Sequence, residues 1–78
     1  MYLVVGANGF LGSYLIKNIL DMTDERVLAA DLNCPPEFRA RVKWTKCDIT
    51  NDADVSALRE KTIGQKLKIL FLAAYHHP

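Results

Sequence analysis

The stretch VVGANGFLGSYL, residues 4–15, decides the fold of this chain. It contains three glycines at three-residue intervals, Gly6, Gly9 and Gly12, directly after the apolar run YLVV. The run does not alternate with polar residues, which predicts a short strand buried on both faces. From Gly9 the apolar residues recur at helical spacing, which predicts a helix that ends near residue 22. The expected apolar face of this helix comprises Leu11, Leu15, Ile16, Ile19 and Leu20.

The rest of the chain continues the alternation of strands and helices. Apolar runs at residues 27–30 and 68–74 and an alternating run at residues 42–47 predict three more strands. Candidate caps at residues 48–52 and a glycine at position 64 bracket a second helix that ends near residue 62. The order β-α-β-β-α-β implies an α/β fold with a Rossmann-type parallel sheet, strand order 3-2-1-4, incomplete at its end.

Length and composition indicate a small globular protein. The chain has 78 residues, of which 50% are hydrophobic, and a formal net charge of +1. This balance gives no electrostatic reason to expect a nucleic acid or a membrane surface as a partner. No apolar run approaches the ~18 residues that span a bilayer, and the start lacks the basic region of a signal peptide. We therefore expect a cytoplasmic protein.

The two cysteines, Cys34 and Cys47, follow no metal-ligand spacing. We expect both to be reduced thiols, with a disulfide as the alternative. Two adjacent histidines, His76 and His77, could bind a metal or act as general acid-base groups, and the alternative is that they belong to a polar loop.

The three glycines lie where a dinucleotide can reach the N-terminus of a helix. The free N–H groups and the dipole at such an end form an anion site. Gly6 would allow a tight turn, Gly9 the approach of a pyrophosphate, and Gly12 close packing of the helix on the sheet. Asp31 follows the second strand, 19 residues after Gly12, where its carboxylate can accept hydrogen bonds from the ribose hydroxyls. The alternative is that the glycines only form a tight turn.

Asp31 also bears on the choice of cofactor. A carboxylate at this position repels the 2′-phosphate of NADP, which a neighbouring arginine or lysine would attract. The three residues that follow, LNC, include no base. The sequence therefore favours NAD over NADP. Arg39 and Arg41 could still fold back toward the adenine, and the alternative is that they are solvated loop charges.

With these motifs in this order, the chain resembles the extended short-chain dehydrogenase/reductases, the NAD-dependent epimerase/dehydratase group. GANGFLGSYL resembles that family's phosphate loop, and AADLN resembles its second strand with the cofactor-selecting acid. CDITNDADV is similar to its third strand end, and ILFLAAYHHP is similar to its fourth strand. The chain departs from the family at Val5, where Thr or Ser is common, and at Leu72, where His precedes the paired alanines.

The resemblance implies a set of cofactor-binding residues. Asp48 and Ile49 would contact the adenine, and Ala73 and Ala74 would line the nicotinamide side of the groove. The full set expected at the cofactor is Gly6, Asn8, Gly9, Phe10, Leu11, Gly12, Asp31, Leu32, Asp48, Ile49, Leu72, Ala73 and Ala74. The match predicts one partial domain over residues 1–78, the N-terminal part of a dinucleotide-binding (Rossmann) domain.

The family's catalytic pair, Tyr-x-x-x-Lys, has no counterpart here. Tyr14 is followed four places later by Asn18, and Tyr75 has no residue four places on. No catalytic residue is carried over, and the chain alone is expected to be inactive. The resemblance implies a longer parent that transfers hydride to and from a small substrate, as nucleotide-sugar epimerases, dehydratases and reductases do. It assigns no role to His76 and His77 and leaves a homo-oligomer open.

Two other functions remain open. A relative that keeps the glycine loop without the tyrosine would be a non-catalytic sensor of dinucleotides. A free-standing interaction domain would have the same fold and no cofactor. The apolar last strand also predicts that further chain or a partner covers it, because natural sheets avoid flat apolar edges.

Overall fold

The computed structural model describes residues 1–36 and 39–72. Within them the chain forms four strands and two helices: β1 (Tyr2–Val5), α1 (Phe10–Met22), β2 (Val27–Asp31), β3 (Val42–Lys46), α2 (Asp52–Thr62) and β4 (Lys68–Phe71). All strand pairs are parallel, and the order across the sheet is β3-β2-β1-β4. The predicted Rossmann-type sheet is confirmed. Residues 73 and 74, predicted as the end of the last strand, lie outside the described residues.

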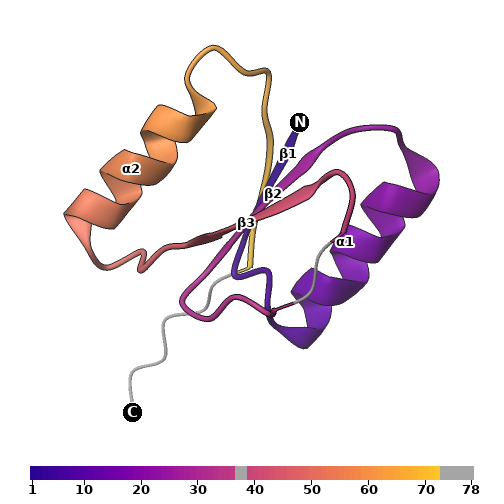
Figure 1. Cartoon of the computed structure of the whole chain (residues 1–78), viewed down its shortest axis with the longest axis horizontal. Coiled ribbons are helices and arrows are strands. Elements are labelled where there is room, and N and C mark those ends of the chain that lie inside the picture. The colour runs from indigo at the N-terminus through magenta and orange to yellow at the C-terminus, as the bar shows by residue number, and fades with distance from the viewer. Residues whose placement is uncertain (37–38, 73–78) are drawn as a thin grey trace.

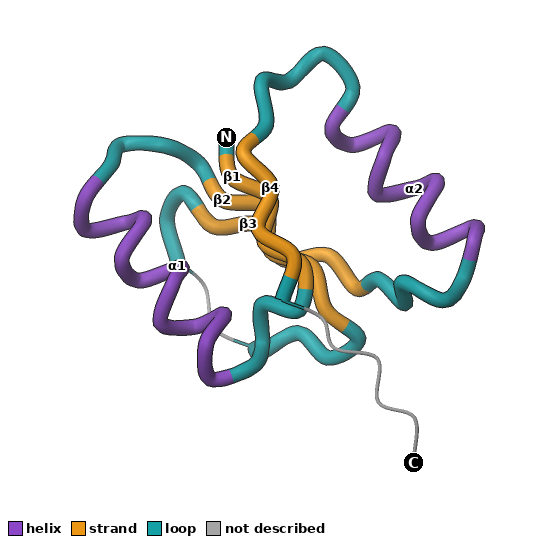
Figure 2. Tube along the Cα trace, turned by 180° about the vertical axis from the view of Figure 1, so that it is seen from behind, coloured by secondary structure: helices purple, strands orange, loops and turns teal. Residues whose placement is uncertain are grey.

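The two helices lie on opposite sides of the sheet, which makes the sheet the middle of three layers (Figures 1 and 2). On the α1 side, Ile16 and Ile19 pack with strand residues such as Val4, which is fully buried. Leu11, predicted on the buried face of α1, is instead 54% exposed. Gly12 takes the buried position of the first helical turn, whereas Ile16 and Ile19 are buried as predicted.

On the α2 side the packing is looser. Leu3, Val5 and Leu28 form a buried cluster, against which Leu58 of α2 packs as a partly buried side chain. No residue of α2 is itself buried. The helix therefore covers this face of the sheet only in part.

The open part of this face lies over β4. Ile69 and Phe71 alternate along the strand and are 59% and 60% exposed, although both are large and apolar. Leu70, which points to the other face, is partly buried against the α1 cluster. Strand alternation thus gives β4 one packed face and one open face.

Local caps define the ends of α2. The Asn51 side chain accepts a hydrogen bond from the Asp54 N–H at 3.0 Å, as a helix N-cap does. Gly64, with φ +79°, lies two residues beyond the last helical residue. Both ends agree with the predicted caps.

Candidate cofactor-binding site

A groove of about 280 Å³ lies at the carboxyl ends of β1, β2 and β3, beside the start of α1. Its lining residues are Val5, Gly6, Gly9, Ala30, Asp31, Leu32, Cys47, Ile49 and Leu72. β1 pairs with β2 on one side and with β4 on the other. The chain reaches β2 through α1 on one face of the sheet, and it reaches β4 through α2 on the opposite face (Figure 1). Open parallel sheets bind ligands at this switch point, outside the carboxyl ends of the strands.

The loop between β1 and α1 is tied to the end of β2. The N–H groups of Gly6 and Ala7 both donate to the Ala30 carbonyl, at 2.8 and 3.1 Å. The next N–H, of Asn8, donates to the Asp31 carboxylate at 2.9 Å. Gly6 has φ +81°, a left-handed conformation that favours glycine. The loop is therefore held in place without a bound ligand.

The N-terminus of α1 has free hydrogen-bond donors. Gly9 is the N-cap residue, it supplies no side-chain cap, and the first turn contains no acidic residue. The first backbone bond of the helix runs from the Ser13 N–H to the Gly9 carbonyl at 3.0 Å. Among the described residues, no acceptor bonds the N–H groups of residues 9–12. Free donors of this kind, together with the helix dipole, are able to bind an anion.

The three glycines differ in what the fold requires of them. A Cβ on Gly12 would lie 2.5 Å from the carbonyl oxygen of Ala7, so only glycine allows this close packing. A Cβ on Gly9 would lie 3.7 Å from the Gly6 carbonyl oxygen, an ordinary contact, and Gly9 has φ −84°. The fold thus requires glycine at positions 6 and 12, whereas position 9 has room for a side chain.

The Asp31 carboxylate faces the same groove from the end of β2. One oxygen accepts the Asn8 N–H at 2.9 Å, and the other accepts the Asn33 N–H at 3.3 Å. A carboxylate has about four lone-pair sites, so acceptor capacity remains for hydroxyl groups of a ligand. The residue both holds the glycine loop and presents an acceptor beside it.

Apolar side chains form the rest of the groove. Ile49 and Leu72 line it together with Cys47, which is buried. Burial raises the pKa of the Cys47 thiol, and the nearby carboxylates of Asp54 and Asp48 raise it further. The thiol is therefore a neutral part of the wall and not a nucleophile. Cys47 and Cys34 are both free, as predicted.

Asp48 does not line the groove. Its carboxylate accepts hydrogen bonds from the Thr50 N–H at 2.9 Å and the Thr50 hydroxyl at 2.6 Å. These bonds lower the pKa of Asp48. Its N–H donates to the Asp54 carboxylate at 2.9 Å, which ties the end of β3 to α2. In this structure Asp48 organises the turn into α2.

Two other predicted residues, Asn8 and Phe10, line a neighbouring cavity of about 470 Å³ together with Lys17 and Arg39. Phe10 is 94% exposed there. Leu11 and Gly12 line neither this cavity nor the groove. The remaining calls, on Ala73, Ala74, His76 and His77, lie outside the described residues.

Three residues of the groove were not predicted from the sequence: Val5, Ala30 and Cys47. Each lies within one residue of the end of a strand. Aligning the carboxyl ends of the parallel strands would have indicated them.

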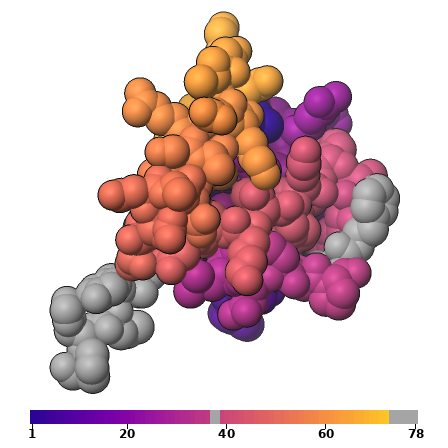
Figure 3. All heavy atoms as spheres, turned by 60° about the vertical axis from the view of Figure 1, so that its left-hand side comes forward, coloured from indigo at the N-terminus to yellow at the C-terminus, as the bar shows by residue number. Residues whose placement is uncertain are grey.

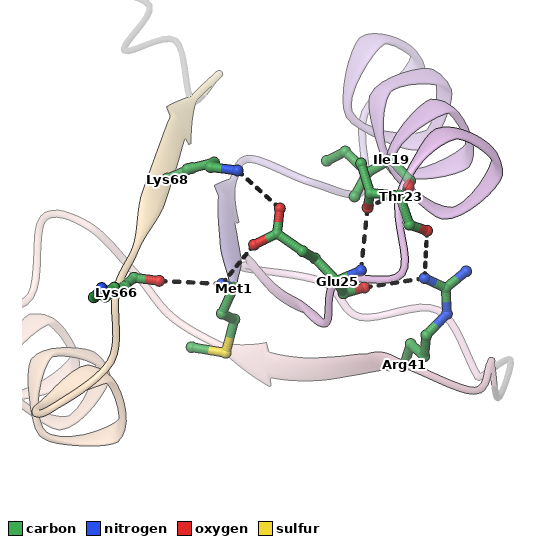
Figure 4. A network of polar contacts seen from close by, with 7 residues as sticks. All are labelled: Met1, Ile19, Thr23, Glu25, Arg41, Lys66 and Lys68. Atoms are coloured by element: carbon green, nitrogen blue, oxygen red, sulfur yellow. Dashed lines mark hydrogen bonds and ion pairs between the residues drawn. The ribbon is translucent and has the colours of Figure 1, made fainter.

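The two arginines of the loop before β3 have different surroundings. The Arg41 guanidinium donates to the carbonyls of Thr23 at 2.7 Å and Glu25 at 3.2 Å (Figure 4), and to that of Leu20 at 2.7 Å. It therefore binds the C-terminal end of α1 and does not fold back toward the groove. Arg39 lines the cavity beside the glycine loop.

The described part of the chain contains no group of three or more His, Cys, Asp or Glu side chains that could hold a metal ion. Neither of its helices is long and apolar enough to cross a bilayer.

The chain is similar to known proteins over nearly its whole length. The model of the NAD dependent epimerase/dehydratase family matches residues 2–78. The PbgP3 protein from Burkholderia pseudomallei is 30% identical over 94% of this chain, with a TM-score of 0.71. A monomeric L-threonine 3-dehydrogenase from a metagenome, in its apo form, is 28% identical over 96% of this chain, with a TM-score of 0.70.

This chain covers 22% and 23% of those two chains. No curated protein matches it. The parallel sheet, the glycine loop and the groove at the strand ends agree with the family match. The chain belongs to the NAD-dependent epimerase/dehydratase family, whose members have a Rossmann-type fold and use a nicotinamide dinucleotide cofactor.

Proposed function

We propose that residues 1–78 are the N-terminal part of a dinucleotide-binding domain and bind the cofactor of a longer enzyme. The chain covers less than a quarter of either solved structure to which it is similar. It contains the glycine loop and the ribose-binding acid but no Tyr-x-x-x-Lys pair. On this proposal the chain binds and orients the cofactor, while the catalytic residues belong to sequence beyond it.

Gly9 is the observation that carries the proposal. The fold leaves room for a Cβ at this position, yet the position is glycine and faces the groove. A pyrophosphate that approached the free N–H groups of residues 9–12 would contact the Cα of Gly9. A side chain there would obstruct the ligand without disturbing the fold.

We propose NAD as the cofactor in preference to NADP. The Asp31 carboxylate accepts the Asn8 N–H within the loop, so its negative charge is fixed where the ribose would bind. A 2′-phosphate would be repelled by that charge. Arg41, which directly precedes β3, does not offset this charge, because its guanidinium is hydrogen-bonded to carbonyls at the end of α1. Two bases, Lys17 and Arg39, line the cavity beside the loop.

The proposed reaction of the parent is hydride transfer on a small hydroxylated substrate, such as a nucleotide sugar. A nicotinamide dinucleotide supplies the hydride acceptor or donor when it is bound. The residues of this chain would hold the pyrophosphate at α1, the ribose at Asp31 and the adenine near Ile49. None of them takes or gives a proton in this proposal.

Calorimetric titration with NAD and NADP tests the proposed site. Gly9→Val should abolish NAD binding while lowering the free energy of unfolding by no more than about 2 kcal/mol, because the Cβ has room and valine is a poorer N-cap residue than glycine. Ala57→Val, an exposed site on α2, adds a branched side chain away from the groove and serves as the matched control.

Asp31→Asn tests the cofactor preference in the same titration. The asparagine carbonyl can still accept the Asn8 N–H, but the charge is removed. We expect the ratio of NAD to NADP affinity to fall by about tenfold, the effect of ~1.4 kcal/mol.

Unchanged NAD binding in Gly9→Val would refute the pyrophosphate site. Tighter binding of NADP than NAD to the unchanged chain would refute the role of Asp31.

A further inference from the structure

The two cysteines of the chain meet at one backbone atom. The carbonyl oxygen of Asp31, at the end of β2, accepts the Cys47 N–H at 2.9 Å. The same oxygen accepts a weak hydrogen bond from the Cys34 thiol at 3.9 Å. The Cys47 nitrogen and the Cys34 sulfur are therefore no farther apart than the sum of these two distances. In Figure 3 the segments that end β2 and β3, coloured magenta and pink, touch at the surface of the molecule.

The parallel register of β2 and β3 brings the two cysteines together. Asp31 pairs with Lys46, so Cys47, the next residue along the chain, lies beside the end of β2. Cys34 follows the same strand end by three residues, and the chain turns there so that its thiol reaches the Asp31 carbonyl. A disulfide joins residues whose Cα atoms are about 5.5–6 Å apart. A small movement of one segment would therefore allow the two sulfurs to bond.

The segment that carries Cys34 is the one free to move. Residues 32–36 are mostly exposed. Their hydrogen bonds within the described part of the chain run only to Asp31, from the Asn33 N–H at 3.3 Å and from the Cys34 thiol. Cys47 is different, because it is buried and follows directly from the paired strand β3. A bridge would form by movement of this loop, with the sheet unchanged.

We propose that Cys34 and Cys47 form a reversible disulfide that closes the cofactor groove. Asp31, Leu32 and Cys47 line the groove, whereas Cys34 lies outside its lining. A bridge between the two sulfurs would draw the loop, with the half-exposed Leu32 side chain, across the groove beside Asp31. A ligand could then no longer reach that carboxylate. The effect on NAD rests on the proposed function, but the disulfide itself does not.

A small disulfide such as oxidised glutathione supplies the oxidant. The Cys34 thiolate attacks one sulfur of oxidised glutathione, which forms a mixed disulfide and releases one glutathione thiolate. The Cys47 thiolate then attacks the Cys34 sulfur, and the second glutathione leaves as its thiolate. The two protons that the cysteines lose are taken up by the two glutathione thiolates. Two cysteine thiols are thus oxidised to one disulfide, and one glutathione disulfide is reduced to two thiols.

The different exposure of the two thiols sets the order of these steps. Cys34 is exposed and Cys47 is buried, so a dissolved disulfide reaches Cys34 first. Burial raises the pKa of Cys47, which keeps this thiol protonated and inert toward solutes at neutral pH. Once Cys34 carries the mixed disulfide, the reacting sulfur is held beside Cys47 at a high effective concentration. Closure should become faster as the pH rises, because a larger fraction of Cys47 is then thiolate.

Mass spectrometry of the chain after incubation with oxidised glutathione tests the disulfide. We expect the monomer to lose the two thiol hydrogens, and a protease digest to contain a peptide pair joined through Cys34 and Cys47. Dithiothreitol should restore the reduced mass. Cys47→Ser should stop at the mixed disulfide on Cys34, and Cys34→Ser should remain unmodified, because its remaining thiol is buried.

Calorimetric titration with NAD tests the closure of the groove. The oxidised chain should bind NAD at least about tenfold more weakly than the reduced chain. Cys34→Ser is the matched control, because position 34 lies outside the lining of the groove. This variant should bind NAD as the reduced chain does, both before and after incubation with oxidised glutathione.

Three results would overturn the proposal. The first is a mixed disulfide on Cys34 that does not pass on to Cys47 in the folded chain. The second is a disulfide that leaves the affinity for NAD unchanged. The third is an equal loss of NAD affinity in Cys34→Ser after oxidation. Failure of the reduced chain to bind NAD would instead refute the proposed cofactor site, and the mass measurement would still decide the disulfide.

Discussion

Gly12 lies against the backbone of Ala7, where the start of α1 crosses the end of the glycine loop. A Cβ there would come within 2.7 Å of both the carbonyl carbon and the Cα of Ala7. Backbone atoms cannot move aside as a flexible side chain can. Gly12→Ala should therefore lower the free energy of unfolding by about 1–3 kcal/mol, the usual cost of overpacking. Urea denaturation measures this change.

Gly9→Ala is the control for that prediction. The same methyl group has room at position 9, so only the N-cap preference changes, and the cost should stay below about 1 kcal/mol. Equal losses of stability in the two variants would contradict the view that close packing requires glycine at position 12 and that only ligand binding requires it at position 9.

Residue identity alone could predict part of the site. The glycine spacing and Asp31 indicated the loop and the acid, and the structure joins them through the Asn8 N–H. Asp48 was harder to interpret, because a carboxylate near a strand end can face a ligand or cap a turn. Its bonds to Thr50 show that it caps the turn here.

At the scale of elements, α1 and α2 differ in how they are held. α1 buries Gly12, Ile16 and Ile19, whereas α2 buries no residue. The start of α2 depends on local bonds: the Asp54 N–H donates to the Asn51 side-chain oxygen, and the Asp48 N–H donates to the Asp54 carboxylate. Packing therefore secures the first helix, and capping contributes more to the second.

The C-terminus of α1 is capped by another element. Arg41, in the loop before β3, donates to the carbonyls of Thr23 and Glu25 (Figure 4), and to that of Leu20. The last carbonyls of a helix have no partner within the helix, so these bonds satisfy groups that water would otherwise bind. The backbone of Arg41 has φ +72°, which is unfavourable for a residue with a side chain.

Arg41→Met should lower the free energy of unfolding by about 1–2 kcal/mol, since charge-assisted hydrogen bonds at an exposed site are lost. Arg41→Lys keeps the charge but cannot span three carbonyls with a planar fork, so its loss should be intermediate. Thermal or urea unfolding of the three chains gives the comparison. A lysine variant as stable as the original would show that charge, and not the fork, is what matters.

At the scale of the whole molecule, Glu25 connects segments that are far apart in the sequence. Its carboxylate binds the N-terminal ammonium of Met1 at 3.0 Å and the Lys68 ammonium at 2.9 Å (Figure 4). Met1 also donates to the Lys66 carbonyl at 3.1 Å. The starts of β1 and β4 are thus joined through a residue that follows α1.

This network predicts a pH dependence of stability. The hydrogen bonds from Lys68 and the N-terminal ammonium lower the pKa of Glu25 below its ordinary value of 4.5. The folded state then binds the proton less readily than the unfolded state. The contribution of Glu25 is present above pH 4.5 and is lost as the pH falls through the lowered pKa.

The hydrogen bond that Lys68 donates to Glu25 raises the pKa of Lys68 above 10.5, so the same pair also weakens at high pH. Its contribution is present below pH 10.5 and is lost as the pH rises through the raised value. Glu25→Gln should reduce the change in unfolding free energy with pH, both at acidic pH and at alkaline pH. Glu60→Gln removes an equal charge from an exposed site on α2 without an ion pair. Parallel pH profiles in the two variants would contradict the role of the network.

The sequence by itself determined the order of the elements, the parallel sheet and the position of the glycine loop. These features rest on local patterns: the spacing of apolar residues, the glycines at 6, 9 and 12, and the fixed handedness of strand–helix–strand units. Each of these patterns is contained in a short stretch of neighbouring residues, so it predicts local structure without information on contacts between distant segments.

Only the tertiary structure decided which of those residues meet. Val5, Ala30 and Cys47 come together because the parallel register aligns three strand ends. Whether a Cβ fits at Gly9 or at Gly12 depends on its distance from the backbone of Gly6 or of Ala7, and that backbone is positioned by the rest of the fold. Contacts of this kind join segments far apart in the chain, and their distances follow from packing and not from sequence spacing.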